Sequence, residues 1–265
     1  MKVYGADFSG ARDASRGIFY AGGTLRQGTL LIEQVVHCDD RLDLLAAIHF
    51  SRAPWGLDFP FSITIEAMKS LNISGWEELL EVVANYERSN YDLFISGSGI
   101  DSCEARCLET SVCCRAVDAG IKAFSPLKKT NPNMRMMTYA GLKLLAYLRR
   151  LGNTVYPFDC PDRERSRLYE VYPSHTWLQL GLSHSLSLEV LLEQFQKRYN
   201  LKLEIEDHLL QLESLDAADA VAACITVAYG LDHYNLEVDW SRKHSWISDV
   251  EWEKRQQEGL VLQII

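Results

Sequence analysis

None of the apolar runs in this chain of 265 residues is long enough to form a transmembrane helix. The sequence has no internal repeat and no low-complexity tract. Hydrophobic residues (47%) and charged residues (24%) occur at ordinary levels, which excludes disordered and collagen-like chains. The first residues turn acidic at Asp7, so the apolar stretch of a signal peptide is missing. We therefore expect a soluble globular protein of the cytoplasm that does not contact a membrane.

Cysteine occurs seven times, and this odd number favours a reducing compartment over a disulfide scaffold. Four of the cysteines lie between 103 and 114, with spacings unlike those of a zinc ribbon and without a histidine pair. We expect a helix over 103–117 in which they are reduced, mostly buried thiols: Cys103, Cys107, Cys113 and Cys114.

A basic surface is also missing overall, because the net charge is -9, which excludes a protein that coats nucleic acid through bulk electrostatics. The charge is unevenly distributed, however. Residues 122–167 hold ten Lys and Arg but three Asp and Glu, which makes this segment +7 and the remainder -16. The segment predicts a surface that faces phosphates, with Lys128, Lys129 and Arg135 among its contacts, although an exposed helical face explains the same charges equally well.

The length fits a single domain over 1–265. Three β-rich runs, at 3–7, 17–23 and 29–36, follow one another with short connections, which favours an antiparallel meander. A helix over 42–49 and a strand over 53–60 complete a β-β-β-α-β order. Helical patterns then dominate residues 62–152, which we interpret as a helical insertion within the domain.

Alternating strand and helix patterns resume after the insertion. We expect strands over 154–158 and 168–173 and a helix over 186–199. A long Ala-rich helix over 215–229 follows, capped by Ser214 and stopped by Gly230, and its lack of a broad polar face predicts burial on most sides. A short helix over 249–257 and a strand over 260–262 end the chain. These elements predict an α/β protein.

The acids mark the candidate site. Asp7, Asp58 and Glu170 lie within or at the end of apolar strand patterns, where an unpaired buried carboxylate is costly. Strand ends of an open α/β sheet meet at one crevice, and Asp216 and Asp219 share one face of the long helix. Taken singly, each acid has a local explanation, such as a helix-start charge or a turn. Their joint occurrence favours one site in which a cation such as Mg²⁺ or Mn²⁺ gathers them.

Several short motifs resemble a known family. The β-β-β-α-β order, GADFSG at 5–10, GLDFP at 56–60 and DAADAVAA at 216–223 resemble the RNase H-like fold, with a late acidic pair closer to that of Holliday-junction resolvases. Together with YEVYP at 169–173 they are similar to the family called domain of unknown function 429, whose members are described as predicted RNase H-like nucleases. The chain departs from RNase H proper because its first helix offers no equivalent acid.

The resemblance implies a mixed, five-stranded sheet with an inserted helical segment. It also implies metal-dependent hydrolysis of phosphodiester bonds in nucleic acid, DNA or RNA. Asp7 would bridge two ions, Asp58, Asp216 and Asp219 would complete their shells, and Glu170 would bind metal or orient water. Ser9 and the basic segment would contact the substrate. Two alternatives stay open: a nucleotide-binding phosphotransferase of the sugar-kinase and heat-shock ATPase type, and a non-catalytic binding module that kept the fold.

Overall fold

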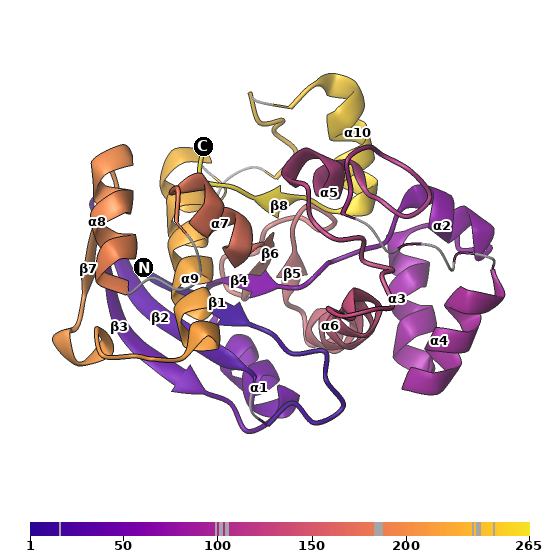
Figure 1. The fold of residues 1–265 in the computed structure, drawn as a ribbon, viewed down its shortest axis with the longest axis horizontal. Coiled ribbons are helices and arrows are strands. Elements are labelled where there is room, and N and C mark those ends of the chain that lie inside the picture. The colour runs from indigo at the N-terminus through magenta and orange to yellow at the C-terminus, as the bar shows by residue number, and fades with distance from the viewer. Residues whose placement is uncertain are drawn as a thin grey trace.

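A computed structural model provides the structure of the chain (Figure 1). It describes residues 1–15, 17–98, 100, 103, 106–182, 188–234, 236, 240–245 and 247–265. The chain opens with the expected meander: β1 (Lys2–Asp7), β2 (Phe19–Arg26) and β3 (Thr29–His37) pair antiparallel. Gln27 and Gly28 connect β2 to β3, and both have the positive φ angles that a tight hairpin turn requires.

The remaining strands join the meander in parallel. β4 (Pro54–Asp58) pairs with β1, β6 (Arg167–Val171) with β4, and β7 (Lys202–Ile205) with β3. The short strands β5 (Thr154–Val155) and β8 (Val261–Leu262) both pair with β6. The described residues therefore form a mixed sheet in the order β5-β6-β4-β1-β2-β3-β7, with β8 beside β6. The α/β class is confirmed, but the sheet has eight strands where five were expected.

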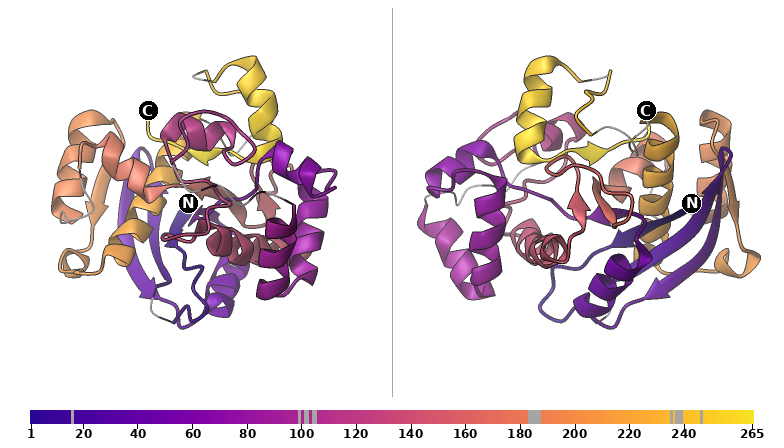
Figure 2. Two further views of the ribbon diagram at one scale, coloured as in Figure 1. Left: turned by 45° about the vertical axis from the view of Figure 1, so that its right-hand side comes forward. Right: turned by 180° about the vertical axis from the view of Figure 1, so that it is seen from behind.

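Two layers of helices cover the sheet (Figures 1 and 2). α1 (Arg41–Ser51), which connects β3 to β4, packs with α6 (Met134–Arg150) against one face. The Ala-rich helix α9 (Leu215–Tyr234) packs against the other. The Ser214 hydroxyl accepts from the Ala217 amide at 3.3 Å, as a cap does, whereas Gly230 is buried inside the helix and does not end it.

Glycines on β1 and β4 let α9 lie directly on the sheet. A Cβ atom at Gly5 would stand 2.0 Å from the Cys224 nitrogen, and one at Gly56 would stand 2.6 Å from Cγ2 of Val227. Real Cβ atoms do not approach other atoms this closely, so a larger residue at either position would push the helix away. The close approach places the first turn of α9 beside the ends of both strands.

Helices occupy most of the segment 62–152. They are α2 (Ile65–Ser70), α3 (Trp76–Asn85), α4 (Arg88–Gly97), α5 (Ala116–Ile121) and α6. The helix expected over 103–117 is wrong, because the described residues between 103 and 115 form a loop closed by two disulfides, Cys103–Cys113 and Cys107–Cys114. In a helix, Cys103 and Cys113 would lie about 15 Å apart, whereas their Cα atoms are 5.4 Å apart. The expectation that these four cysteines are reduced thiols is also wrong, because all four form disulfides.

The C-terminal part follows the expected order with shifted ends. The strand expected over 168–173 stops at Val171, and Pro173 begins α7 (Pro173–Gln179), since proline suits the first turn of a helix. α8 (Leu188–Arg198) matches the expected helix, whose first residues lie outside the described part. A short 3₁₀ turn, η1 (Asp207–Leu209), precedes α9, and α10 (Asp249–Glu258) precedes β8. Within the described residues, no helix combines the length and apolarity that membrane spanning demands.

Candidate active site at the ends of the central strands

Asp7 and Asp58 are the last residues of two neighbouring parallel strands. The register pairs them directly, Asp7 on β1 with Asp58 on β4. Side chains at the same level of adjacent strands leave the sheet on the same face, here the face that Gly5 and Gly56 turn to α9. The two carboxyl groups hydrogen-bond to each other.

α9 adds the two other aspartates of this cluster. Asp216 and Asp219 lie in its first turns and act electrostatically on Asp7. Nε1 of Trp177, on α7, donates to Oδ1 of Asp219 at 2.6 Å and orients that carboxylate. We call Asp7, Asp58, Asp216 and Asp219 the aspartate cluster. The structure thus brings together four of the five acids that the sequence singles out.

The two aspartates at the strand ends, Asp7 and Asp58, both have strongly raised pKa values. Burial, followed by the charges of Asp219 and Asp216, raises the pKa of Asp7 well above its usual range. Burial and the charges of Asp7 and Asp219 do the same to the pKa of Asp58. The largest of these contributions come from burial and from other acids. Burial and repulsion therefore favour a proton on the hydrogen-bonded pair of Asp7 and Asp58.

The donors of the cluster suit a hard divalent cation such as Mg²⁺ or Mn²⁺, because they are carboxylate oxygens that repel one another. Among the residues that the structure describes, no three or more His, Cys, Asp or Glu side chains stand where they could hold a metal ion together. To hold a cation together, Asp7 and Asp58 would have to be ionised, and the carboxylates of the cluster would have to move closer to one another.

Glu170 lies on the opposite face of the sheet and belongs to a different cluster. Its register partner on β4 is Leu57, so alternation points it away from the face that carries Asp58. Nη2 of Arg115 donates to Oε1 of Glu170 at 2.6 Å, and Nη1 donates to Oε2 at 3.0 Å. Oε2 also accepts from the Phe61 amide at 3.0 Å. A metal ion would have to displace Arg115 to bind Glu170.

Arg115 is bound from a second side by Asp118. Nε and Nη2 donate to the two oxygens of Asp118, each at 2.8 Å, and Nη1 also donates to the Glu258 carbonyl. Burial lowers the pKa of Arg115, but the two carboxylates raise it by more, so the guanidinium stays charged. Burial raises the pKa of Glu170 and Arg115 opposes this shift; we take the pair as ionised because both Glu170 oxygens accept from the guanidinium. Arg115, Asp118 and Glu170 form the ion-pair cluster.

Two of the three basic residues expected to contact substrate are structural. Arg135 is completely buried and donates to Asp92 and to Ser96, each at 3.0 Å. Lys128 is 3% exposed, and its ammonium group donates to the Thr130 hydroxyl at 2.9 Å and to backbone carbonyls beside it. Neither reaches solvent, so the expectation that they bind phosphates is wrong. Lys129 is half exposed, and its Nζ atom lies 3.4 Å from Oδ2 of Asp92.

A hollow of about 380 Å³ opens over the aspartate cluster, and both Asp7 and Asp216 line it. Ser9 lines it too, near Asp216, since a Cβ atom at Gly17 would touch both side chains. Arg88 stands at its edge and donates to the Gly10 carbonyl at 2.9 Å. Arg88 also lines two adjoining hollows, together with further basic residues: Arg12, Arg41, Lys129 and Lys143.

The sequence interpretation missed these arginines because they lie outside the basic segment 122–167. Arg88 and Gly10 are 78 positions apart, so only the fold brings Arg88 to the aspartate cluster. Trp177 was also missed, because it lies 42 positions from Asp219 in the sequence and only the fold brings the two side chains together. The one local signal for a basic residue near the aspartate cluster was that Arg12 lies close to Asp7 in the sequence.

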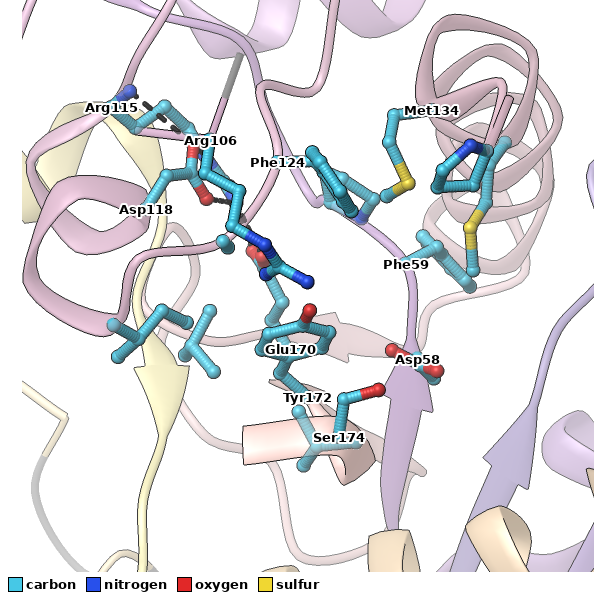
Figure 3. A pocket seen from close by; sticks show the side chains of 17 residues that line it. Asp58, Phe59, Arg106, Arg115, Asp118, Phe124, Met134, Glu170, Tyr172 and Ser174 are labelled. Atoms are coloured by element: carbon cyan, nitrogen blue, oxygen red, sulfur yellow. Dashed lines mark hydrogen bonds and ion pairs between the residues drawn. The ribbon is translucent and has the colours of Figure 1, made fainter. Parts of the chain in front are cut away.

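A second hollow, of about 250 Å³, lies on the other side of Asp58 (Figure 3). Phe59, Phe124 and Tyr172 contribute aromatic walls, and Arg106 contributes a positive charge. Ser174, at the start of α7, points its hydroxyl toward Asp58 in Figure 3. Asp58 therefore connects the aspartate cluster with an aromatic hollow.

Comparison with known proteins adds no relative. No protein-family model matches the chain, and no curated protein or solved structure matches it either. The function is therefore argued from the site alone.

Proposed function

We propose that this protein is a metal-dependent nuclease of RNase H-like fold that hydrolyses phosphodiester bonds in nucleic acid. The observation that carries the proposal is the aspartate cluster, which gathers four acids from two strand ends and one helix, and in which burial and the neighbouring acids raise the pKa values of Asp7 and Asp58. Divalent ions, when bound, lower the pKa of a water molecule and neutralise charge on the phosphoryl group.

The strand order supports the fold assignment. The run β3-β2-β1-β4-β6, antiparallel in the meander and parallel beyond it, agrees with the β-β-β-α-β order that the family resemblance implies. In open α/β sheets, ligands bind outside the carboxyl ends of parallel strands. Asp7 and Asp58 end two such strands, so the cluster stands where this architecture places its ligands.

The residues of the chain have separate tasks in this proposal. Asp7, Asp58, Asp216 and Asp219 would hold the ions, and Trp177 orients Asp219 for this task. Ser9 and Arg88, in the same hollow, bind the substrate phosphate. The arginines and lysines of the adjoining hollows then hold the flanking backbone, because phosphate contacts position a strand irrespective of its sequence.

Glu170 has no part in metal binding in this proposal. Its ion pair with Arg115 fixes the disulfide-closed loop against the end of β6, and so shapes the hollow next to Asp58. The cytoplasmic location remains a prediction from the sequence, and the two disulfides are of a kind that is rare in that compartment.

The test compares wild type with Asp7→Asn in nuclease assays with Mg²⁺ or Mn²⁺ on single-stranded, duplex and branched DNA and RNA. We expect cleavage by wild type and a loss of at least about a hundredfold in the variant, the scale seen when one group that stabilises the transition state is removed. Asp39→Asn is the matched control, because this side chain is 94% exposed. Equal cleavage by Asp7→Asn would overturn the proposal, and nucleic acid binding without metal binding or cleavage would point to a non-catalytic module.

A further inference from the structure

The hollow beside Asp58 has the build of a ligand pocket rather than of a packing defect. Its walls come from segments far apart in the chain: the end of β4, the loop before α5, the start of α6 and the junction of β6 with α7 (Figure 3). At about 250 Å³ it is slightly smaller than the pockets that hold drug-sized molecules, which measure about 300–1,000 Å³. Its occupant is therefore a single small group.

The chemistry of the walls narrows the occupant. Phe59, Phe124 and Met134 present apolar surface, as Figure 3 shows, while Tyr172 and Arg106 add polar atoms to the lining. Such a surface accepts a flat group whose faces are apolar and whose edge forms hydrogen bonds.

The planar guanidinium group of Arg106 is held in place at the mouth of the pocket. Its guanidinium lies over the Phe124 ring, 4.2 Å from the ring centre, and Nη1 donates to the Lys122 carbonyl at 3.1 Å. The side chain is nevertheless exposed, so the guanidinium is accessible from solvent. Arginine planes and aromatic rings are the surfaces on which proteins stack unpaired nucleobases, and arginine also donates to base edges.

The acids of the pocket are not available to bind a cationic ligand. Both oxygens of Glu170 and both of Asp118 accept from Arg115, which neutralises much of this wall. Asp58, at the opposite end, belongs to the aspartate cluster. A group in the pocket therefore lies immediately next to the site where the proposed function places the phosphate.

We propose that this pocket binds an unpaired nucleobase of the nucleotide adjoining the phosphate at the aspartate cluster. The inference rests on the proposed function and narrows its substrate class. A base in a continuous duplex is stacked and paired, and extruding it costs free energy that an unpaired base does not require. The enzyme accordingly prefers single-stranded nucleic acid, or the unpaired nucleotides of loops and branches, to an intact duplex.

The experiment measures binding without catalysis. A short single-stranded DNA labelled with one 2-aminopurine is titrated with the protein in EDTA, and its fluorescence and anisotropy are recorded. The same strand with an abasic site in place of the 2-aminopurine, carrying a terminal dye for anisotropy, reports the contribution of the base. We expect wild type to bind the base-containing strand about tenfold more tightly than the abasic strand, the scale of one stacked base.

Arg106→Gln and Phe124→Leu remove the two parts of the stacking surface. Each is expected to bind the base-containing strand about tenfold more weakly and to bring the two strands close to equal affinity. Arg150→Gln is the matched control, because it removes the same charge from an exposed arginine that pairs with Glu81 on the surface and lines a different hollow. It should retain the full preference for the base. Circular dichroism and thermal unfolding of each variant check that the fold is kept.

The outcomes separate this inference from the proposed function. Equal wild-type affinity for the base-containing and abasic strands would overturn the inference even if Asp7→Asn abolishes cleavage. So would a loss of preference in Arg150→Gln equal to that in Arg106→Gln. A base-dependent affinity that Arg106→Gln abolishes would support the pocket even if no cleavage is found, and in that case the nuclease assignment alone would fail.

Discussion

The two buried acidic clusters lie on opposite faces of the same strand ends and have opposite electrostatic designs. In the ion-pair cluster, Arg115 binds Glu170 and Asp118 with four hydrogen bonds of 2.6–3.0 Å. In the aspartate cluster, four acids face one another, and burial and repulsion raise the pKa values of Asp7 and Asp58. The difference shows that a buried acid in a strand pattern does not by itself mark a functional site, because a partner from elsewhere in the chain decides its role.

The comparison also has an energetic side. The ion-pair cluster contributes to holding the fold, whereas the aspartate cluster opposes folding at neutral pH, since carboxylates that repel one another are brought together. Functional sites commonly reduce stability in this way. Substitutions of the same chemical kind should therefore change stability in opposite directions in the two clusters.

The largest expected effect follows from removing the shared cation of the ion-pair cluster. Arg115→Met leaves Asp118 and Glu170 buried without their partner, so we expect the free energy of unfolding to fall by about 3–5 kcal/mol. Urea denaturation measures it. The control is Arg150→Met, which breaks a surface pair with Glu81 and should lower it by less than about 1 kcal/mol. Equal losses in the two variants would contradict the structural role of Arg115.

A smaller effect of mixed sign is expected when one acid of each cluster becomes an amide. Asp58→Asn removes an acid that must either repel Asp7 or take up a proton when the chain folds, so without divalent metal at neutral pH we expect the free energy of unfolding to rise by about 0.5–2 kcal/mol. Glu170→Gln weakens charged hydrogen bonds and should lower it by about 1.5–3 kcal/mol. Chemical denaturation of both variants in EDTA makes the comparison. If both variants changed the free energy of unfolding in the same direction, the proposed electrostatic difference between the two clusters would be wrong.

The smallest effect concerns pH. Because the folded pKa values of Asp7 and Asp58 are raised, the folded state keeps a proton that the unfolded chain has released. This contribution to stability is present below the ordinary aspartate pKa of about 3.9 and is lost as pH rises through the raised pKa values. The loss is at most about 1.4 kcal/mol per pH unit for one proton.

The measurement is the difference in unfolding free energy between wild type and Asp58→Asn across pH in EDTA, which cancels the other titrating groups. As pH rises, the free energy of unfolding of Asp58→Asn should increase relative to that of wild type. A difference that stays constant with pH would mean that the carboxyls of the aspartate cluster titrate normally.

Local sequence patterns located the meander, the first helix, β4 and the long Ala-rich helix, because hydrophobic periodicity survives in these elements. They also located four acids that meet. They failed over 103–117, where two disulfides override the helical pattern. They failed again for Lys128 and Arg135, since exposure of a basic residue depends on what packs around it, and both are buried.

Glu170 illustrates the limit most clearly. Its place in an apolar strand was visible in the sequence, but its face of the sheet depends on the register between β6 and β4, where it pairs with Leu57. Its partner Arg115 lies 55 positions away in the chain. Neither fact is encoded in a local pattern.

The sequence by itself determined the first three strands, the first helix, β4 and the long Ala-rich helix, and it showed that acids end β1 and β4, because these features follow from short-range patterns of apolar and polar residues. Only the tertiary structure decided which acids share a face and which of them pair with Arg115. The physical reason is that pairing of charges and alternation of faces depend on distances in space between segments that are far apart along the chain.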